Sequence, residues 1–354
     1  MMEAAAIILS LFFAMNIGAS GAAASMGVAY GSGAINRRMA ALLLCGAGVI
    51  LGAVLGGGEV VKTISSGIIP QSMITMQIVL VVIGSAAISL FMANLMGIPL
   101  STSEVTVGAV VGVGVAYHAL YVQSVLIIMM FWVIIPVAAF FITYFICRAC
   151  KPLFSRLEAR GGKLLIYLLI AAGFFEAFSA GMNNVANAVG PLVAAGVISV
   201  NKGVWIGGFF VAAGAVLLGG RVLETNGKKI TRLSKTEGIV ISGTGALLVT
   251  ISSLFGLPVP LTQVTSTSIM ASGAAKNGAI VFQKGIVKKI VKVWIVSPLV
   301  SLAISYVMVK LFVQSDFYST FSAVAIMVAT LGVLSLMKAI KKEKRSVHEQ
   351  GGGI

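Results

Sequence analysis

Apolar residues in this chain form long uninterrupted stretches rather than the short alternating or amphipathic patterns of soluble proteins. The stretches lie at 4–35, 39–57, 73–96, 98–117, 121–147, 164–199, 203–220, 238–256, 258–275, 293–313 and 321–337. One helix crossing a bilayer needs about 20 apolar residues, and most of the stretches reach that length. The pattern predicts an all-α polytopic membrane protein with about 11 transmembrane segments.

Two of the stretches, 4–35 and 164–199, are longer than one crossing requires. Their second halves are rich in Gly, Ala, Ser or Asn. Non-helical backbone at membrane depth is tolerated only where it lines a cavity inside the protein. We therefore expect broken or re-entrant helices in both stretches, with a tilted helix that has a long interfacial end as the alternative.

Composition and charge agree with a membrane protein. The chain is 58% hydrophobic and only 10% charged, whereas about a quarter of the residues of a soluble domain are charged. The net charge is +15. If the N-terminus lies outside the cell, every Lys and Arg except Lys62, Lys202 and Lys310 falls on the cytoplasmic side. Such a bias indicates orientation, with the C-terminus in the cytoplasm, rather than a nucleic-acid partner. The basic tail can also contact anionic lipid.

Catalytic and metal-binding patterns are missing from the sequence. Cys147 and Cys150 form a lone C-x-x-C, and the two histidines, His118 and His348, lie far from it along the chain. A structural zinc site needs four ligands, and an enzyme needs a nucleophile with its base or a ligand cluster. We predict that the protein is not an enzyme and has no metal site and no cofactor.

An internal repeat relates the two halves of the chain. Residues 18–27 (GASGAAASMG) match 181–190 (GMNNVANAVG), and 97–108 (GIPLSTSEVTVG) match 256–267 (GLPVPLTQVTST). With 11 segments the first copy starts outside and the second inside, so the halves are inverted, as in secondary transporters with a midplane site. The predicted divisions are a first repeat at 1–118, a linker helix and basic loop at 119–163, a second repeat at 164–283, and two scaffold helices with a basic cytoplasmic tail at 284–354.

These motifs resemble the inorganic phosphate transporter (PiT) family, which carries G-A-N-D-V-A-N and G-x-P-x-S-T-T-H once in each half. Here both signature aspartates are replaced, by Gly21 and Asn184, and both motif histidines by Glu104 and Gln263. In the family the aspartates belong to the sodium and phosphate site. The pattern is most similar to the bacterial sulfate permease branch (the CysP type), and the family implies a homodimer.

The lost carboxylates bear on the substrate. Phosphate near neutral pH keeps a hydroxyl that a carboxylate can accept, whereas sulfate only accepts hydrogen bonds, so a facing carboxylate would be repelled and left unpaired. Hydroxyls and amides suit sulfate. The candidate substrate-binding residues are Asn16, Ser20, Gly21, Ser25, Ser101, Thr102, Ser103, Asn183, Asn184, Asn187 and Thr262.

We therefore predict sulfate import across the bacterial plasma (inner) membrane by alternating access. Thiosulfate and other tetrahedral oxyanions remain open, and the alternative is an inorganic phosphate symporter coupled to sodium or protons. A passive anion channel is a further alternative. Without the aspartates a proton is favoured over sodium as the coupling ion. Carboxyls at membrane depth are functional candidates, and those for proton coupling are Glu104, Glu176 and Glu237.

Overall fold

The computed structural model describes residues 1–330, and within that range the chain consists of helices and their connections. The helices are α1 (Met2–Ile17), the π-helix η1 (Gly18–Ala22), α2 (Ala23–Ser25), α3 (Gly27–Gly31), α4 (Arg38–Gly56), α5 (Gly58–Ser66), the 3-10 helix η2 (Gln71–Met73), α6 (Met76–Leu95), α7 (Thr102–Ala116), α8 (Val122–Ala149), α9 (Lys151–Arg160), α10 (Lys163–Ala194), α11 (Val200–Leu218), α12 (Gly220–Glu224), the π-helix η3 (Thr225–Lys229), α13 (Lys235–Leu254), α14 (Leu261–Asn277), α15 (Ile280–Gln283), α16 (Gly285–Met308) and the π-helix η4 (Val309–Val313). An apolar helix at Phe317–Thr330 follows. The last residues of the predicted segment 321–337 and the basic tail lie outside the described range.

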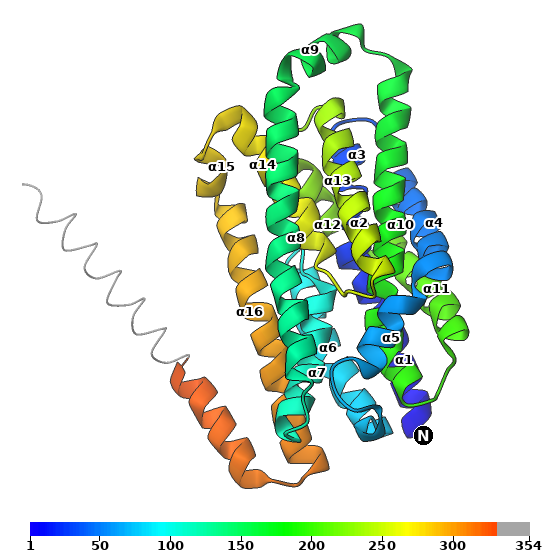
Figure 1. Cartoon of the computed structure of the whole chain (residues 1–354), viewed down its shortest axis with the longest axis vertical. Helices are drawn as coiled ribbons and strands as arrows, with labels where there is room; N and C mark the ends of the chain where they lie inside the picture. The colour runs from blue at the N-terminus through cyan, green and yellow to red at the C-terminus, as the bar shows by residue number, and fades with distance from the viewer. Residues whose placement is uncertain (331–354) are drawn as a thin grey trace, which may run out of the picture.

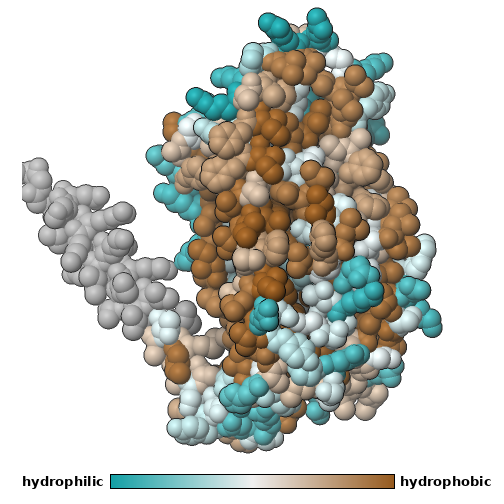
Figure 2. All heavy atoms as spheres, viewed as in Figure 1, coloured by the Kyte–Doolittle hydropathy of each residue, from teal (hydrophilic) through white to brown (hydrophobic). Residues whose placement is uncertain are grey.

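Eight helices of the described chain are long and apolar enough to cross a membrane. They are α1 with η1 and α2, then α4, α6, α8, α10, α11, α13, and α16 with η4. Hydrophobic side chains form a broad belt between hydrophilic ends (Figure 2). The prediction of an all-helical, polytopic membrane protein is confirmed, whereas the number of crossings stays a prediction.

The helices lie mostly along one long axis (Figure 1). Helix α9 lies at one end of the molecule, here called the α9 end, and the N-terminus lies at the other. At the α9 end, Glu158 of α9 accepts hydrogen bonds from the backbone N–H and hydroxyl of Thr236, at 2.8 and 3.0 Å. This contact holds the α8–α9–α10 connection against the start of α13.

The predicted helix breaks are only partly correct. The first long segment does depart from regular α-helix, through the π-helical η1 and the change to α3 after Met26. The break predicted in the second long segment, 164–199, is wrong, because α10 continues without a break from Lys163 to Ala194. Its Gly- and Asn-rich half is helical and almost entirely buried. Mostly buried non-helical stretches lie instead at 96–101 and 255–260, where the predicted segments 73–96 and 98–117, and 238–256 and 258–275, adjoin.

Glycines allow the central helices to touch backbone to backbone. A Cβ added at Gly52 of α4 would lie 1.8 Å from the carbonyl oxygen of Phe178 in α10, and one at Gly214 of α11 would lie 1.9 Å from that of Met15 in α1. Gly52 corresponds to Gly214, and Met15 to Phe178, at nearly the same separation along the chain that relates the repeated motifs. The correspondence supports the internal repeat, with each half packing a helix on the other half.

We expect Gly52→Ala to destabilise the protein, because overpacking a close backbone contact costs about 1–3 kcal/mol. The matched control is Gly243→Ala in α13, where an added Cβ would meet no atom within 4 Å. Thermal unfolding in detergent measures both. A melting temperature that falls equally in the two variants would contradict the close packing of α4 on α10.

Candidate functional site

Two unwound stretches, 97–101 and 256–260, position the residues of the later motif. Each begins with a glycine in the left-handed region, Gly97 at φ 63° and Gly256 at φ 70°, where an L-residue would be strained. A proline follows two residues later in each, and both stretches are almost entirely buried. Non-helical backbone at this depth is what membrane proteins keep where it borders an internal site.

Each unwound stretch is held by a tryptophan from a helix of the other half. The indole N–H of Trp132 in α8 donates to the carbonyl of Pro258 at 3.0 Å, and that of Trp294 in α16 donates to Pro99 at 3.1 Å. Both tryptophans stand four residues before a proline within their helix. The correspondence between the halves thus reaches α8 and α16, which the sequence analysis left outside the repeat.

Helices α7 and α10 are joined by a network of hydroxyls and amides. Asn187 Nδ2 donates to Thr102 Oγ1 at 3.2 Å, and Thr102 donates to Asn184 Oδ1 at 3.1 Å. Asn187 Nδ2 also lies 3.3 Å from Ser103 Oγ, which lies 3.3 Å from Asn183 Oδ1. All five side chains are at least 98% buried. The network therefore links both family motifs in one enclosed cluster, here called the amide–hydroxyl cluster.

The two signature positions of the repeat meet beside this cluster. A Cβ added at Gly21 would lie 2.7 Å from Asn184 Nδ2 and 3.8 Å from the Thr102 methyl group. Asn184 Nδ2 has no hydrogen-bond partner within the described chain, and neither do the buried hydroxyls of Ser25 and Thr262. Unpaired buried donors are costly, so they are available to a ligand that accepts hydrogen bonds.

Glu104 and Gln263, the residues that replace the motif histidines, touch each other. Gln263 Nε2 donates to Glu104 Oε1 at 2.6 Å, while Glu104 Oε2 has no partner in the described chain. The backbone N–H of Glu104 donates to Ser101, the N-cap of α7. The side chains of Glu104 and Gln263 are both more than 90% buried. The first turns of α7 and α14 thus face each other, which turns two positive helix ends toward the same region.

A second carboxyl, Glu176 of α10, is fully buried next to α13 and α14. The hydroxyl of Thr265 donates to Glu176 Oε1 at 2.5 Å, and Glu176 Oε2 is unpartnered in the described chain. A Cβ at Gly245 would lie 2.8 Å from Oε1. A side chain at position 245 would therefore require the Glu176 carboxyl to shift from this position.

We expect Gly245→Ala to displace the Glu176 carboxyl and to lower transport about 10-fold or more, with protein folding retained. Gly243→Ala, two residues away on the same helix with open space around its Cβ, is the control and should transport like the wild type. Uptake into reconstituted vesicles measures both. Equal uptake by the two variants would show that the position of Glu176 is unimportant.

Asn16, Ser20 and Glu237 are among the predicted site residues that form their hydrogen bonds away from the amide–hydroxyl cluster. Ser20 is bonded to the backbone N–H and carbonyl of Leu100, so it anchors the unwound stretch. Asn16 bonds Asn94 and Phe12 and borders a separate cavity of about 300 Å³. Glu237 forms the capping box of α13 and an ion pair with Lys276 at 2.5 Å.

The sequence analysis also missed polar partners of the site. Gln263 and Thr265 hydrogen-bond the two buried carboxyls, and Ser253 accepts from Asn183 Nδ2 at 2.9 Å. A signal was present for Thr265, which matches Thr106 in the aligned motifs. No local pattern marked Ser253, because its contact spans two distant helices.

Comparison with known proteins agrees with this architecture. The sequence profile of the phosphate transporter family (PHO4) matches residues 17–160 and 154–305. The chain belongs to the phosphate transporter family. A relative in this family, the sulfate permease CysP of Bacillus subtilis (strain 168), is 66% identical over 356 residues and is covered completely, as is this chain.

A solved structure shares the fold of this family member. It is described as the sodium-dependent phosphate transporter, with a TM-score of 0.77 at 24% identity, over 88% of this chain and 100% of that chain. Family membership confirms a multi-pass membrane transporter rather than an enzyme, as the sequence predicted.

Proposed function

We propose that this chain imports sulfate across the bacterial plasma membrane by proton-coupled symport and alternating access. Sulfate transport rests on the full-length similarity to a sulfate permease. The observation that carries the choice of anion is the amide of Asn184 beside Gly21, with its N–H atoms unpaired and with no carboxylate at either signature position.

The amide–hydroxyl cluster suits a fully deprotonated dianion. Asn184, Ser25 and Thr262 can donate to sulfate oxygens, and the N-terminal turns of α7 and α14 add positive potential. A carboxylate at position 184 would face the dianion with like charge and with no donor of its own unless protonated. Phosphate, which retains a hydroxyl donor near neutral pH, gains less from such a site.

Glu104 and Glu176 are the carboxyls that we propose for proton coupling. Both are buried, and each has one oxygen bonded and one unpartnered in the described chain. An ionised carboxylate is costly in such surroundings, and a bound dianion nearby raises that cost. Binding of sulfate therefore favours uptake of a proton by the carboxyl. Glu237 is a weaker candidate because Lys276 already neutralises it. We also propose that the N-terminus lies outside the cell and the α9 end lies in the cytoplasm. We propose further that the protein functions as a homodimer.

Substrate choice is tested by uptake of labelled sulfate and labelled phosphate into liposomes that contain the purified protein, in sodium-free buffer. Sulfate uptake should exceed phosphate uptake, and unlabelled phosphate should compete weakly. Preferred phosphate uptake, or uptake that requires sodium, would overturn the proposal in favour of a phosphate symporter.

A further inference from the structure

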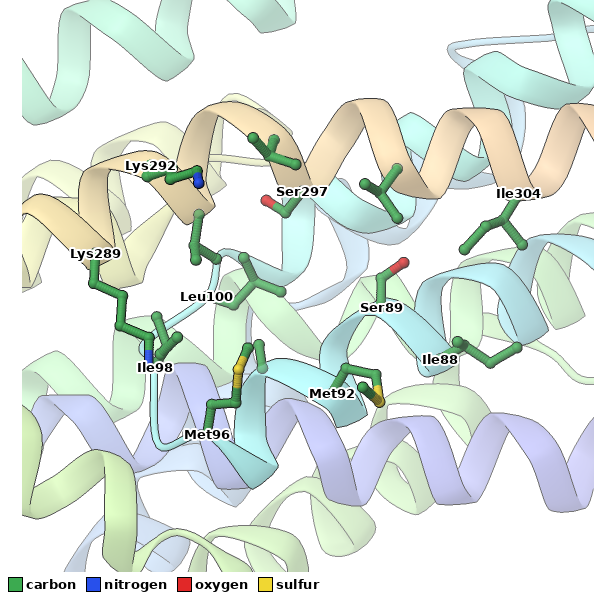
Figure 3. Close-up of a pocket in the computed structure, with 14 residues that line it drawn as sticks. Ile88, Ser89, Met92, Met96, Ile98, Leu100, Lys289, Lys292, Ser297 and Ile304 are labelled. Atoms are coloured by element: carbon green, nitrogen blue, oxygen red, sulfur yellow. The ribbon is translucent and has the colours of Figure 1, made fainter. Parts of the chain in front are cut away.

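A groove of about 450 Å³ lies between α6 and α16, and none of the residues of the amide–hydroxyl cluster lines it. Its walls are apolar, with Met92 and Met96 on α6 and Val296 and Val300 on α16 (Figure 3). Ser89 and Ser297 are the uncharged polar side chains along it. Both helices are long and apolar enough to cross a membrane. Met92, Met96 and Val300 are exposed, so the groove opens at the apolar surface that would face lipid.

Two lysines lie at one end of this groove. Lys289 and Lys292 of α16 line that end, while Ile88 and Ile304 line the opposite end (Figure 3). Both lysines are exposed, and neither forms an ion pair with a residue of the described chain. The groove therefore combines two exposed lysines at one end with apolar walls along the rest of its length.

The length of the groove matches one half of a bilayer. From Lys292 to Ile304, α16 rises about 18 Å at 1.5 Å per residue, and one leaflet of the hydrocarbon core is about 15 Å thick. We propose that the groove binds one anionic phospholipid, with its phosphate between Lys289 and Lys292 and an acyl chain along the α6–α16 wall. Basic pockets between transmembrane helices bind acidic headgroups by the same physics.

The bound lipid would also touch the transport machinery. Ile98 and Leu100 line the groove, and they belong to the unwound stretch that leads into Ser101. The same stretch receives the hydrogen bond from Trp294 of α16. An acyl chain in the groove therefore packs against the outer side of a stretch whose next residues carry the candidate site.

Native mass spectrometry of the full chain, titrated with phosphatidylglycerol or with phosphatidylcholine of the same acyl chains, tests this inference. The wild type should bind phosphatidylglycerol about 30-fold more tightly, since each of the two lysines contributes about 1 kcal/mol, or about fivefold. The double variant Lys289→Gln with Lys292→Gln should lose that preference. Lys229→Gln with Lys288→Gln removes two exposed lysines that do not line the groove and should keep it.

A second pair of variants tests the groove without changing charge. Val300→Trp fills the channel and should weaken binding of both lipids at least 10-fold, whereas Leu299→Trp, on the neighbouring lipid-facing position, should not. Equal affinity of the wild type for the two lipids overturns the proposal, as does unchanged phosphatidylglycerol binding by the Val300→Trp variant. A wild-type protein that carries no lipid adduct, as when a second copy covers the groove, overturns it as well.

Discussion

Replacing Glu104 by Gln should abolish accumulation of sulfate driven by a pH gradient, while exchange of internal for external sulfate continues. Glutamine has the shape of glutamate and can still pair with Gln263, whose amide lies 2.6 Å from Glu104 Oε1. It cannot take up or release a proton. One pH unit supplies about 1.4 kcal/mol per proton, or about tenfold in accumulation, and the variant should lose this factor.

The control for Glu104→Gln is Glu59→Gln, which removes an exposed carboxylate paired with Lys62. The control should accumulate sulfate like the wild type. The measurement compares labelled sulfate accumulation under an inward pH gradient with counterflow exchange at equal pH. Gradient-driven accumulation that persists in Glu104→Gln would assign the coupling proton to another carboxyl, with Glu176 as the next to be tested.

Asn184→Asp should raise the apparent KM for sulfate at least 100-fold. A carboxylate about 5 Å from just one of the two negative charges of sulfate costs about 3 kcal/mol at an effective dielectric constant of about 20, which already corresponds to roughly that factor. The substitution also removes the unpaired Nδ2 donor next to Gly21. Hydrogen bonding from Thr102 can continue, because the accepting Oδ1 is retained.

The matched control for Asn184→Asp is Asn201→Asp, on the exposed first turn of α11. Its KM for sulfate should not change. Initial rates of labelled sulfate uptake over a concentration series give both values. A KM that is unaltered in Asn184→Asp would exclude this amide from the anion site.

The sequence predicted the helical architecture well because lipid imposes it. A stretch such as 121–147 has few alternatives to a membrane helix, and the structure has α8 at Val122–Ala149. The polar motif residues were also found, since Thr102, Asn184 and Asn187 form one buried network. Their roles in transport stay predictions.

The positions of the helix breaks were misread because glycine serves two purposes. The Gly- and Asn-rich half of 164–199 was interpreted as broken helix. A Cβ at Gly181 in this half would lie 2.1 Å from the carbonyl oxygen of Val49, so this glycine permits close helix packing. The breaks fall at Gly97 and Gly256, where positive φ and the nearby prolines stop the helix. Composition alone cannot separate a packing glycine from a helix-ending one, whereas the Gly-x-Pro spacing can.

Contacts between the halves lay beyond reasoning on one sequence. Glu104 and Gln263 occupy equivalent places in the two motifs and bond each other in the structure. Local sequence does not report which equivalent positions of the two motifs come together in space. The same holds for Thr265 and Glu176, which are far apart along the chain.

The most direct test of proton-coupled sulfate import is the pH change that sulfate itself causes. Liposomes that contain the protein and a trapped pH-sensitive dye are placed in sodium-free buffer at equal internal and external pH, and sulfate is added outside. The proposal predicts acidification of the interior by wild type and none by Glu104→Gln. Sulfate entry with no acidification, or acidification only when sodium is present, would contradict it.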